Sequence, residues 1–480
     1  MKPVVLVEHG QLWCEGRRNA DSEDDLRNRT VTRAAFDALY RYDTSRPESE
    51  RIFEWHPQHA RATQWVGVIQ LPQLLIEILP KLDAAPRGKV AGQKTMSAAS
   101  TPDLASEDEV ASVPEPLKPA HRAQRNLLYM LAVAGDVPLR PQDVARLDHQ
   151  ASALSETLAA LFADRLLKEM LRGPARDYQA REENLRTLKG KLKLGLQVRH
   201  NAGHMERFFC EYEAFTDDIP LNRVFRAVCR LLLGMVRQSG TQDLLRRCLL
   251  MLDDVRDVRD PRALLPHITL TRQLERFAEL FSFARLFLEH HAPLPGAGDA
   301  RCFSLMFDMN MVFEGFIAGL LRSRVVPRLP GVLLDAQSLR TRRHLLETPT
   351  GTPVLRLKPD LVLKHRLGAL LIIDTKWKRL TAGRHRSGVG RDDLYQLYAY
   401  ATRYEARHSI LLYPRVPGVE AADYQLSSER MKEGTPPQQV GVRFVHLQGE
   451  LWRSSARQAL QEELHTIVRQ GLGLAEGDES

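Results

Sequence analysis

The sequence predicts a multidomain α/β protein with a β-rich N-terminal domain (residues 1–82), a mainly helical middle domain (residues 121–299) and a C-terminal α/β domain (residues 300–480). Two observations predict this organisation. The 480 residues exceed what one hydrophobic core usually serves, so two or three domains are expected. Apolar residues form short strand-like runs near the N-terminus, recur at helical spacing in the middle, and show both patterns toward the C-terminus.

The N-terminal domain is predicted from such short runs. VVLVEHG, residues 4–10, is typical of a strand that ends in a glycine turn. WVGVIQLPQLLIEILPKL, residues 65–82, is typical of two apolar strands separated by Pro72 and ended at Pro80. VTRAAFDALYRY, between them, indicates a helix.

Residues 83–120 differ from both of their neighbours in composition. They contain no aromatic residue and are rich in Ala, Ser, Pro, Asp and Glu. Such a segment buries too little apolar surface to offset the entropy lost on ordering, so we expect a disordered linker or an inserted loop.

The middle domain is predicted to be helical with one basic interruption. Apolar residues recur at helical spacing in AQRNLLYMLAVAG, SALSETLAALFADRLLKEMLRG, NRVFRAVCRLLLGMVRQ and LERFAELFSFARLFLEHH. Within residues 183–200, Lys189, Lys191 and Lys193 alternate with leucines, which predicts a strand with one basic face. Two interpretations stay open: lysines that protect an exposed edge strand from aggregation, or a ribbon that contacts DNA phosphates.

The C-terminal domain is predicted from alternating helices and strands. FDMNMVFEGFIAGLLRSRV and RDDLYQLYAYATRYEA are typical helices, and RSSARQALQEELHTIVRQG adds a last one. Strands are predicted in VLLDAQSLRTRRHLL, PVLRLKPDLVLKH, GALLIIDTKWK, HSILLYPRV and VGVRFVHLQG. We expect a domain built around a short mixed sheet.

Composition is that of a globular protein. Hydrophobic residues make up 43% and charged residues 27% of the chain. No apolar run approaches the roughly 20 residues of a membrane helix, and the first residues lack the apolar core of a signal peptide. We therefore expect a cytoplasmic protein with no membrane partner. The net charge of +8 favours a nucleic-acid partner only modestly, because many basic proteins bind none.

The five cysteines indicate neither a disulfide framework nor a zinc site. They are widely scattered, odd in number and contain no CxxC pair. Reduced, buried thiols are the expectation.

The most strand-like segment ends in an acid and a lysine. In LVLKHRLGALLIIDTKWKRL, residues 361–380, an apolar run typical of a buried central strand leads to Asp374 and Lys376, which share one face of the strand. A hairpin pairing can bring Asp360 of the preceding strand beside Asp374. Two close carboxylates repel unless a proton or a cation lies between them. Mg²⁺ prefers such oxygen ligands, and a lysine beside it can orient or deprotonate an attacking water.

The alternative is a surface ion pair, because a bare DxK motif is short and common. The apolar run, the Pro-Asp step at Asp360, and a following helix with Gln396 and Tyr400 one turn apart favour a catalytic site. In this order, these residues resemble the PD-(D/E)xK nuclease fold with the helix motif of its RecB-like branch. FDMNMVFEGFIAGLL, LLIEILPKL and YQAREENLRTLKGKLKLG resemble McrC, the nuclease subunit of McrBC modification-dependent restriction systems. The resemblance covers nearly the whole chain apart from residues 83–120.

The resemblance implies a PD-(D/E)xK nuclease-like C-terminal domain and a role for each matching residue. Asp360 and Asp374 would bind Mg²⁺, Thr375 would offer its backbone carbonyl, and Lys376 would position the water. Glu314 would hold the metal or a metal-bound water, with a solvated helix surface as the alternative.

Further residues of the motifs have supporting roles. Gln396 and Tyr400 would brace the site or contact the DNA backbone, and ordinary packing is the alternative for both. Asp308 and Asn310 match the family pattern, and we assign them only helix capping.

The chain lacks the GxxxxGK[ST] motif, so it should not bind and hydrolyse a nucleotide by itself. The resemblance implies a McrB-like AAA+ ring that hydrolyses GTP, docked by residues 1–82. It also implies double-stranded, methylated DNA as substrate, with a possible homodimer for double-strand cutting. Two other functions stay open: a non-catalytic adaptor that activates the motor, and a stand-alone RecB-like repair nuclease. The intact Asp360, Asp374 and Lys376 favour catalysis, because a degenerate adaptor would be expected to have lost one of them.

Overall fold

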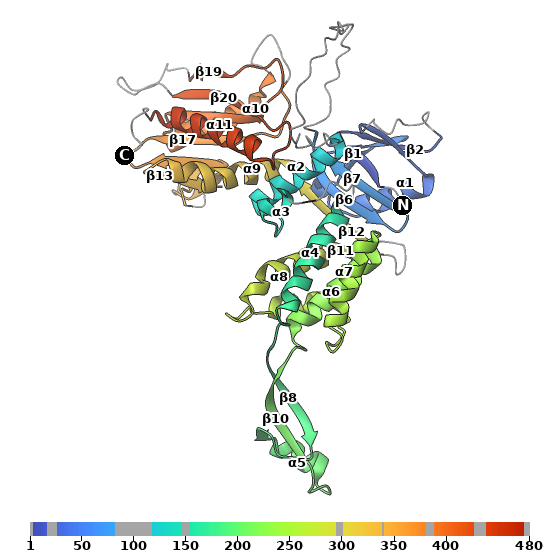
Figure 1. Cartoon of the computed structure of the whole chain (residues 1–480). Coiled ribbons are helices and arrows are strands. Elements are labelled where there is room, and N and C mark those ends of the chain that lie inside the picture. Colours follow the sequence, from blue (N-terminus) through green and yellow to red (C-terminus); the bar gives the residue numbers. More distant parts are fainter. Residues whose placement is uncertain are drawn as a thin grey trace, which may run out of the picture.

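The computed structural model describes residues 3–16, 26–81, 118–145, 147, 153–293, 301–337, 340–380, 388–426 and 438–474. An N-terminal and a C-terminal body lie side by side, helices lie below the first, and a slender arm projects away from them (Figure 1). The expected linker at residues 83–120 lies outside the described residues except for its last three, and helix α2 already begins at Pro119. Within the described part of the chain, no helix is long and apolar enough to span a membrane.

The main N-terminal sheet combines strands from two distant parts of the sequence. Its order is β1 (Val4–Val7), β7 (Leu74–Leu79), β6 (Trp65–Leu71), β12 (Arg301–Asp308) and β11 (His291–Pro293). The predicted strands on both sides of Pro72 are confirmed as β6 and β7. Residue 300 was predicted to start the C-terminal domain, whereas β12 pairs antiparallel with β6, with Leu305 opposite Val68. The N-terminal body is therefore closed by residues that lie more than 200 positions later.

A second, smaller sheet lies beside the first in the N-terminal body. Its order is β3 (Asn28–Val31), β2 (Gln11–Cys14), β5 (His59–Ala62) and β4 (Phe53–Trp55). Leu12 and Ala60 are fully buried on one face, and strand alternation leaves Gln11 and Arg61 on the other, where they pair across the strands. The predicted helix between these strands is α1 (Arg33–Thr44).

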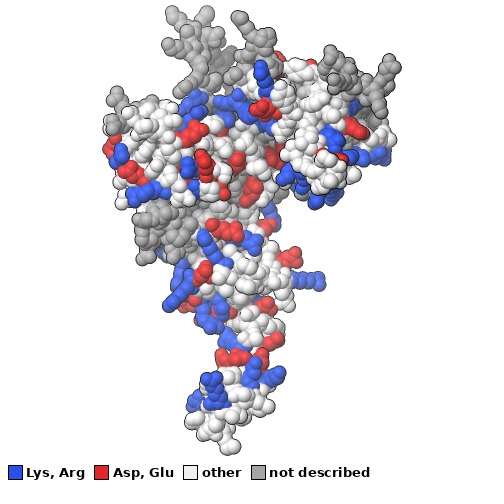
Figure 2. Space-filling model, turned by 180° about the vertical axis from the view of Figure 1, so that it is seen from behind, with Lys and Arg blue, Asp and Glu red and all other residues white. Residues whose placement is uncertain are grey.

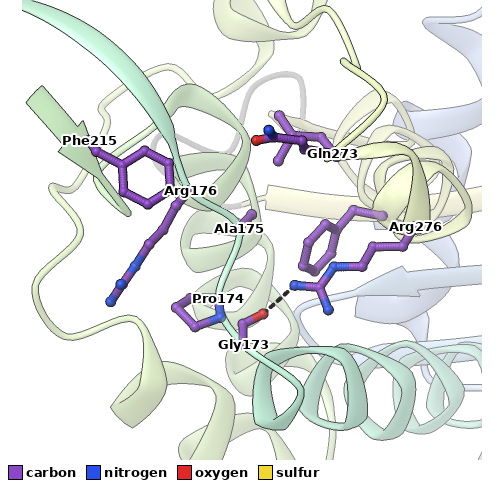
Figure 3. Close-up of a pocket in the computed structure, with 9 residues that line it drawn as sticks. Gly173, Pro174, Ala175, Arg176, Phe215, Gln273 and Arg276 are labelled. Carbon is purple, nitrogen blue, oxygen red and sulfur yellow. Dashed lines mark hydrogen bonds between the residues drawn. The ribbon is translucent and has the colours of Figure 1, made fainter. Parts of the chain in front are cut away.

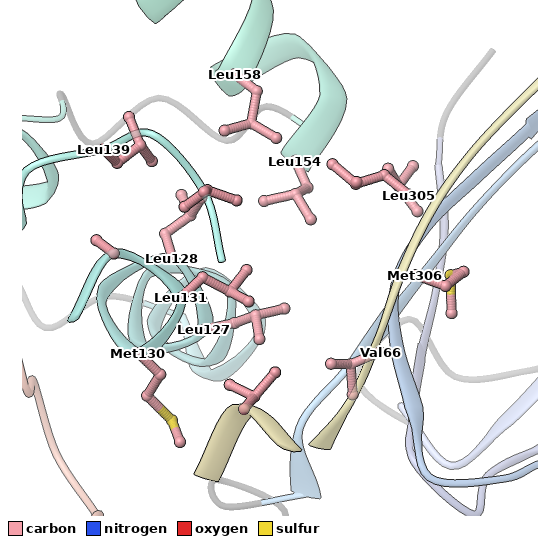
Figure 4. Close-up of a cluster of buried hydrophobic side chains, with 14 of the residues drawn as sticks. Val66, Leu127, Leu128, Met130, Leu131, Leu139, Leu154, Leu158, Leu305 and Met306 are labelled. Carbon is pink, nitrogen blue, oxygen red and sulfur yellow. The ribbon is translucent and has the colours of Figure 1, made fainter. Parts of the chain in front are cut away.

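The predicted helices of the middle region are confirmed. They are α2 (Pro119–Ala134), α4 (Leu154–Leu171), α6 (Pro220–Met235) and α8 (Ala278–Glu289), with α3 (Pro141–Ala145) and α7 (Ser239–Met251) in addition. Figure 4 shows leucines of α2 and α4 facing Val66 of β6 and Leu305 of β12. The helices and the N-terminal sheet thus share one core. All five cysteines are free and buried, as predicted.

The projecting arm is a hairpin of β8 (Asp177–Leu185) and β10 (Phe208–Thr216), with β9 (Lys191–Leu192) and helix α5 (Leu194–Asn201) toward its tip. A cavity of about 350 Å³ lies where the arm joins the helices, and the Arg276 guanidinium donates a 2.5 Å hydrogen bond to the Gly173 carbonyl there (Figure 3). The predicted basic strand is wrong in extent. Only Lys191 and Leu192 pair as a strand, and α5 begins at Leu194.

The C-terminal body contains a six-stranded mixed sheet. Its order is β13 (Val332–Ala336), β16 (Leu361–His365), β17 (Leu370–Thr375), β18 (His408–Pro414), β20 (Gln439–Val445) and β19 (Ala422–Gln425). Two predicted strands are each divided, because β14 (Arg343–Glu347) and β15 (Pro353–Leu357) form a separate hairpin. Asp335 explains the first division, since its carboxylate accepts hydrogen bonds from the backbone N–H groups of Arg340 and Thr341 in a turn.

Helices cover both faces of the central strand β17. Leu371 and Ile373 pack in one core with α9 (Met309–Leu320) and α11 (Ser454–Leu472). Ile372 packs on the opposite face with Leu397 of α10 (Arg391–Tyr404). The predicted buried central strand is confirmed, and the alternation of its side chains points Asp374 to the same side as Ile372.

Helix α9 lies directly against α2. A Cβ atom added at Gly319 would lie 2.3 Å from the Val133 carbonyl oxygen of α2, closer than real side chains approach. Asp308 caps α9 and accepts a 2.8 Å hydrogen bond from the backbone N–H of Asn310, as predicted. This packing fixes the position of α9, the helix that carries Glu314.

Candidate active site

The pairing of β16 with β17 brings two acids together. Leu361 lies opposite Ile373 in this antiparallel ladder, so Asp360 and Asp374 occupy the next pair of positions. Thr375 holds Asp360 in place: its backbone N–H and its hydroxyl both donate 2.7 Å hydrogen bonds to Asp360 Oδ2. The structure therefore gives Thr375 a positioning role that the sequence did not predict.

Asp374 and Lys376 form an ion pair, but not the exposed one that a bare motif would suggest. Lys376 Nζ lies 2.7 Å from Asp374 Oδ2, and the two side chains are only 18% and 1% exposed. Low exposure strengthens the attraction and makes each charge costly without the other. The ion pair is therefore part of a buried site and not a surface ion pair.

A chain of hydrogen bonds extends from Lys376 to helix α10. Lys376 Nζ donates to Gln396 Oε1 (2.9 Å), and Gln396 Nε2 donates to Tyr400 Oη (2.8 Å). The Tyr400 hydroxyl in turn donates to the backbone carbonyl of Lys358 (3.1 Å). The predicted bracing role of Gln396 and Tyr400 thus has a geometric basis, because these bonds tie α10 to the backbone two residues before Asp360.

Glu314 approaches the acids from helix α9. Burial raises its pKa to about 7, and the Asp360 carboxylate adds to this effect, while a hydrogen bond with Gln337 opposes it. Its neighbours Phe313 and Phe316 are fully buried, as predicted. The structure therefore brings Glu314 into the electrostatic range of Asp360 rather than leaving it on a solvated helix face.

The carboxylates of this site are difficult to ionise together. Burial and the neighbouring Asp360 carboxylate together raise the pKa of Asp374 to about 7, although Lys376 acts in the opposite direction. Burial also raises the pKa of Asp360, although its hydrogen bonds with Thr375 counteract this. A bound cation would relieve the repulsion, because it favours the charged form of every neighbouring acid.

The donor atoms of the site suit a hard cation such as Mg²⁺. Asp374 Oδ1 is buried without a hydrogen-bond partner, and oxygen atoms are the ligands that Mg²⁺ prefers. No group of three His, Cys, Asp or Glu side chains in the described residues is close enough to hold a metal ion as it stands. Lys376 and Thr375 instead occupy Oδ2 of Asp374 and Oδ2 of Asp360. The set Asp360, Asp374, Thr375 and Glu314 therefore stays a prediction.

Asp393 is a site residue that sequence reasoning missed. It is buried in the first turn of α10, where Lys378 Nζ lies 3.0 and 3.1 Å from its two carboxylate oxygens. The Tyr413 hydroxyl donates to the same carboxylate (3.3 Å). The negative charge of Asp393 adds to the rise in the pKa of Asp374. Nothing in its sequence neighbourhood marked it, and residues 381–387, between β17 and α10, lie outside the described part.

Trp377 connects the site to the N-terminal body. Its indole Nε1–H donates to both oxygens of the buried Glu8 carboxylate (2.8 and 3.0 Å), and Lys81 Nζ lies 3.4 Å from the same group. The Trp377 ring also packs against Phe313 of α9, with ring centroids 5.3 Å apart. Alternation along the strand explains this arrangement, since Trp377 faces away from Asp374 and Lys376.

The predicted DNA-contacting lysines lie elsewhere, in and beside β9, which belongs to the projecting arm of Figure 1. Lys193 Nζ lies 2.9 Å from Glu182 and 2.9 Å from Glu211, so acids of the same sheet surround its charge. Lys189 Nζ lies 3.9 Å from the centre of the Tyr212 ring, and Lys191 lies opposite Glu211 in the ladder. The three lysines do not form one continuous basic face, and their contact with DNA stays a prediction.

Comparisons with known proteins give a family match and a similar fold. The sequence matches the family described as McrBC 5-methylcytosine restriction system component over residues 60–414. The fold is similar to a chain in a refined half-complex from a tetradecameric assembly of Thermococcus gammatolerans McrB AAA+ hexamers with bound McrC: the TM-score is 0.67 and the identity 20%, covering 97% of this chain and 100% of that chain. A chain of the cryo-EM structure of the Thermococcus gammatolerans McrBC complex gives a TM-score of 0.48 and 21% identity, covering 68% of this chain and 90% of that chain. No curated protein matches.

Proposed function

Because the chain belongs to the family of McrBC 5-methylcytosine restriction system components, we propose that it is the Mg²⁺-dependent DNA endonuclease subunit of a modification-dependent restriction system. One observation carries the proposal. The buried Asp374, the partly buried Asp360 and a lysine meet at the end of a central strand, with Lys376 Nζ 2.7 Å from Asp374 Oδ2. Perturbed carboxylates around a lysine are typical of catalytic sites.

Each residue of the site has a defined task in phosphodiester hydrolysis. Asp360 and Asp374, helped by Glu314, would hold Mg²⁺, and Thr375 keeps Asp360 oriented toward it. When bound, Mg²⁺ lowers the pKa of a water molecule and stabilises charge on the phosphoryl group. Lys376, released from Asp374 by the metal charge, would orient the attacking water while Gln396 and Tyr400 hold its amine in place.

The proposed partner is a McrB-like AAA+ ring that hydrolyses GTP. The similar structure is described as McrB AAA+ hexamers with bound McrC, and the present sequence contains no GxxxxGK[ST] motif of its own. The proposed substrate is double-stranded, methylated DNA, and two copies of the chain would cut its two strands.

Two surfaces are candidates for contact with the ring. Residues 1–82 were predicted to dock, but β6 and β7 are integral to the shared core, so this part cannot be deleted without unfolding it. The arm is the second candidate. Its tip exposes Leu188 (60%), Leu194 (71%), Val198 (69%) and Met205 (91%) to solvent, and exposed apolar clusters are typical of interaction sites.

The catalytic assignment is tested with near-isosteric variants. Asp374→Asn and Lys376→Gln should each slow Mg²⁺-dependent cleavage of methylated plasmid DNA by the reconstituted complex, by roughly 10²–10⁴-fold. Each change leaves one member of a buried ion pair without its partner, so urea unfolding of both variants accompanies the cleavage assay. Asp392→Asn and Lys364→Gln, at exposed positions of α10 and β16, are the matched controls.

The outcomes separate the three possible functions. Cleavage at the wild-type rate by Asp374→Asn would rule out this site and favour the adaptor. Loss of cleavage with intact stimulation of GTP hydrolysis supports the nuclease subunit. Cleavage that needs no ring, together with no capture of the ring in a pull-down, would favour a stand-alone repair nuclease.

A further inference from the structure

A polar cavity lies between the small N-terminal sheet and the segment that follows Lys376. Its volume is about 450 Å³. Strands β2, β3 and β5 contribute one side, and Arg379 contributes the other. The cavity therefore lies where the N-terminal body meets the segment that leaves the candidate active site.

Positive charge predominates in this cavity. Among the described residues that line it, four carry a basic side chain and one carries an acid: Arg27, Arg61, Lys81, Arg379 and Glu8. Glu8 contacts Lys81 (3.4 Å) and accepts hydrogen bonds from Trp377, and Arg61 makes a long contact with Glu54 (3.8 Å). The positive potential also acts on His9, whose pKa falls to about 4 mainly through burial and further through Lys81 and Arg61. Such an excess of positive charge attracts anions.

Stacked rings border the cavity on the sheet side. The rings of His56 and His59 stack with centroids 4.6 Å apart and planes 21° apart, and Trp13 stacks on His59 at 4.7 Å. Flat rings beside basic groups are the combination with which proteins bind nucleic acids, since the bases stack and the phosphates pair with the cations.

The cavity is close to the site of cleavage along the chain. Arg379 follows Lys376 by three residues, so the backbone between them spans at most about 10 Å. Lys81 Nζ donates to the Trp377 carbonyl (3.5 Å), which places the N-terminal side of the cavity against the same segment. Phosphates of one DNA strand advance about 3.4 Å along the helix axis per nucleotide. The Lys376 and Arg379 side chains add to this span, so a phosphate in the cavity would lie within a few nucleotides of the cut.

We propose that this cavity binds a backbone phosphate of the DNA strand that is cut, on one side of the cleaved bond, through Arg61 and Arg379. The inference rests on the proposed nuclease function and adds a binding subsite to it. It gives the small N-terminal sheet a role in holding DNA rather than in docking the motor. Because phosphate contacts position a protein without reading bases, the subsite fixes the register of the cut but not its sequence preference.

The first experiment measures DNA binding without Mg²⁺, so that no cleavage is needed. The full chain carrying Arg61→Gln and Arg379→Gln should bind a methylated duplex about tenfold more weakly. The slope of the logarithm of the binding constant against the logarithm of salt concentration should become shallower by about one unit. Arg33→Gln with Arg41→Gln removes the same charge from helix α1 of the same body and is the matched control. An equal loss in both double variants would overturn the proposal, because it would reflect net charge alone.

The second experiment locates the phosphate. Single uncharged methylphosphonates are placed at successive positions around the cut of the duplex. One position within a few nucleotides of the cut should weaken wild-type binding, and the same substitution should have little further effect on the Arg61→Gln, Arg379→Gln protein, because both remove one contact. The assignment would be overturned if, at every position, the methylphosphonate weakened binding of the double variant as much as binding of the wild-type protein.

Other outcomes separate this proposal from the proposed function. If the wild-type complex binds DNA with the expected phosphate dependence but never cleaves, the nuclease assignment fails and the subsite stands. If the double variant binds DNA normally but no longer stimulates GTP hydrolysis by the ring, the cavity belongs to a protein interface and the subsite is refuted.

Discussion

Glu77 illustrates how one buried acid connects three parts of the molecule. It lies on β7, is only 4% exposed, and its Oε1 accepts hydrogen bonds from Gln124 Nε2 of α2 (2.7 Å) and from the backbone N–H of Leu154 at the start of α4 (3.0 Å). Burial raises the pKa of Glu77 to about 7, which these hydrogen bonds only partly oppose. The carboxyl group therefore links the sheet to two helices most favourably in its protonated form.

The raised pKa of Glu77 predicts a pH-dependent stability. Between its ordinary pKa of 4.5 and about 7, the native state keeps a proton that the unfolded state has lost. The free energy of unfolding should therefore be highest below pH 4.5 for this group and fall by up to about 3 kcal/mol as the pH rises to 7. Glu77→Gln keeps the accepting oxygen and removes the titration, so its urea-unfolding free energy should change less between pH 5 and pH 8. An unchanged pH dependence in this variant would contradict the prediction.

At the residue scale, the sequence predicts which residues form the candidate site better than it predicts which side chains contact each other over long distances in the chain. The shared face of Asp374 and Lys376 follows from strand alternation, and the position of Asp360 beside them follows from a hairpin. The position of Lys193 between Glu182 and Glu211 does not follow, because Lys193 precedes α5 and the two acids lie on β8 and β10, whose register the sequence leaves open. No local sequence pattern predicts the hydrogen bonds from Trp377 to Glu8, because 369 positions separate the two residues.

At the scale of elements, Trp377 joins the exit of β17 to Glu8, which follows β1, and to the side chain of Lys81, which follows β7. Trp377→Phe removes the indole donor and leaves the Glu8 carboxylate without those hydrogen bonds, at a cost of about 1–3 kcal/mol. In a Glu8→Met background, which has no acceptor, the same change should cost less, by about 0.5–3 kcal/mol of coupling energy. Urea unfolding of the four proteins measures this energy.

A matched tryptophan provides the control for that cycle. Trp65 lies on β6, and its Nε1 is buried without a hydrogen-bond partner in the structure as described. Trp65→Phe removes a similar ring without breaking a hydrogen bond, so it should show no coupling to Glu8→Met. Equal costs of Trp377→Phe in both backgrounds would mean that the Glu8 contact contributes nothing to the junction.

The elements themselves were predictable where their pattern is local. Helices α1, α2, α4, α6 and α8 show apolar residues at helical spacing, and β6 and β7 are bounded by prolines. Strand β12 was assigned to the wrong body, because its partner β6 lies far away in sequence and pairing leaves no trace in composition. The turn at Asp335 was missed for a different reason: a side chain that accepts backbone N–H groups ends a strand without any glycine or proline to mark it.

At the scale of the whole molecule, charge does not single out one functional face. Figure 2 shows Lys and Arg interspersed with Asp and Glu over the visible side of both the upper bodies and the narrow lower part. Shape is more informative, since the arm extends away from all other elements (Figure 1). Its side-chain hydrogen bonds, such as Tyr212 Oη to Glu183 (2.7 Å) and Asn184 to Asn201 (2.8 Å), join residues of the arm to each other.

The independence of the arm leads to a prediction about the whole assembly. Gln179 and Ala214 lie opposite each other in the β8–β10 ladder, so a two-residue Asn-Gly turn can join them and replace residues 180–213. The free energy of unfolding of the shortened chain should lie within about 0.5 kcal/mol of the wild-type value, because the removed residues do not contribute to the shared core. It should nevertheless lose stimulation of GTP hydrolysis by the ring if the arm makes that contact.

A second variant separates the apolar tip from the arm as a whole. Serine at Leu194, Val198 and Met205 keeps the hairpin and removes most of the exposed apolar surface of its tip. Burial of such side chains in a partner would stabilise the complex by roughly 1.5–3 kcal/mol each, so the triple variant should weaken ring binding by several powers of ten while DNA binding through the N-terminal cavity stays unchanged. Full stimulation by both arm variants would instead favour motor docking by the N-terminal body, as the resemblance implies.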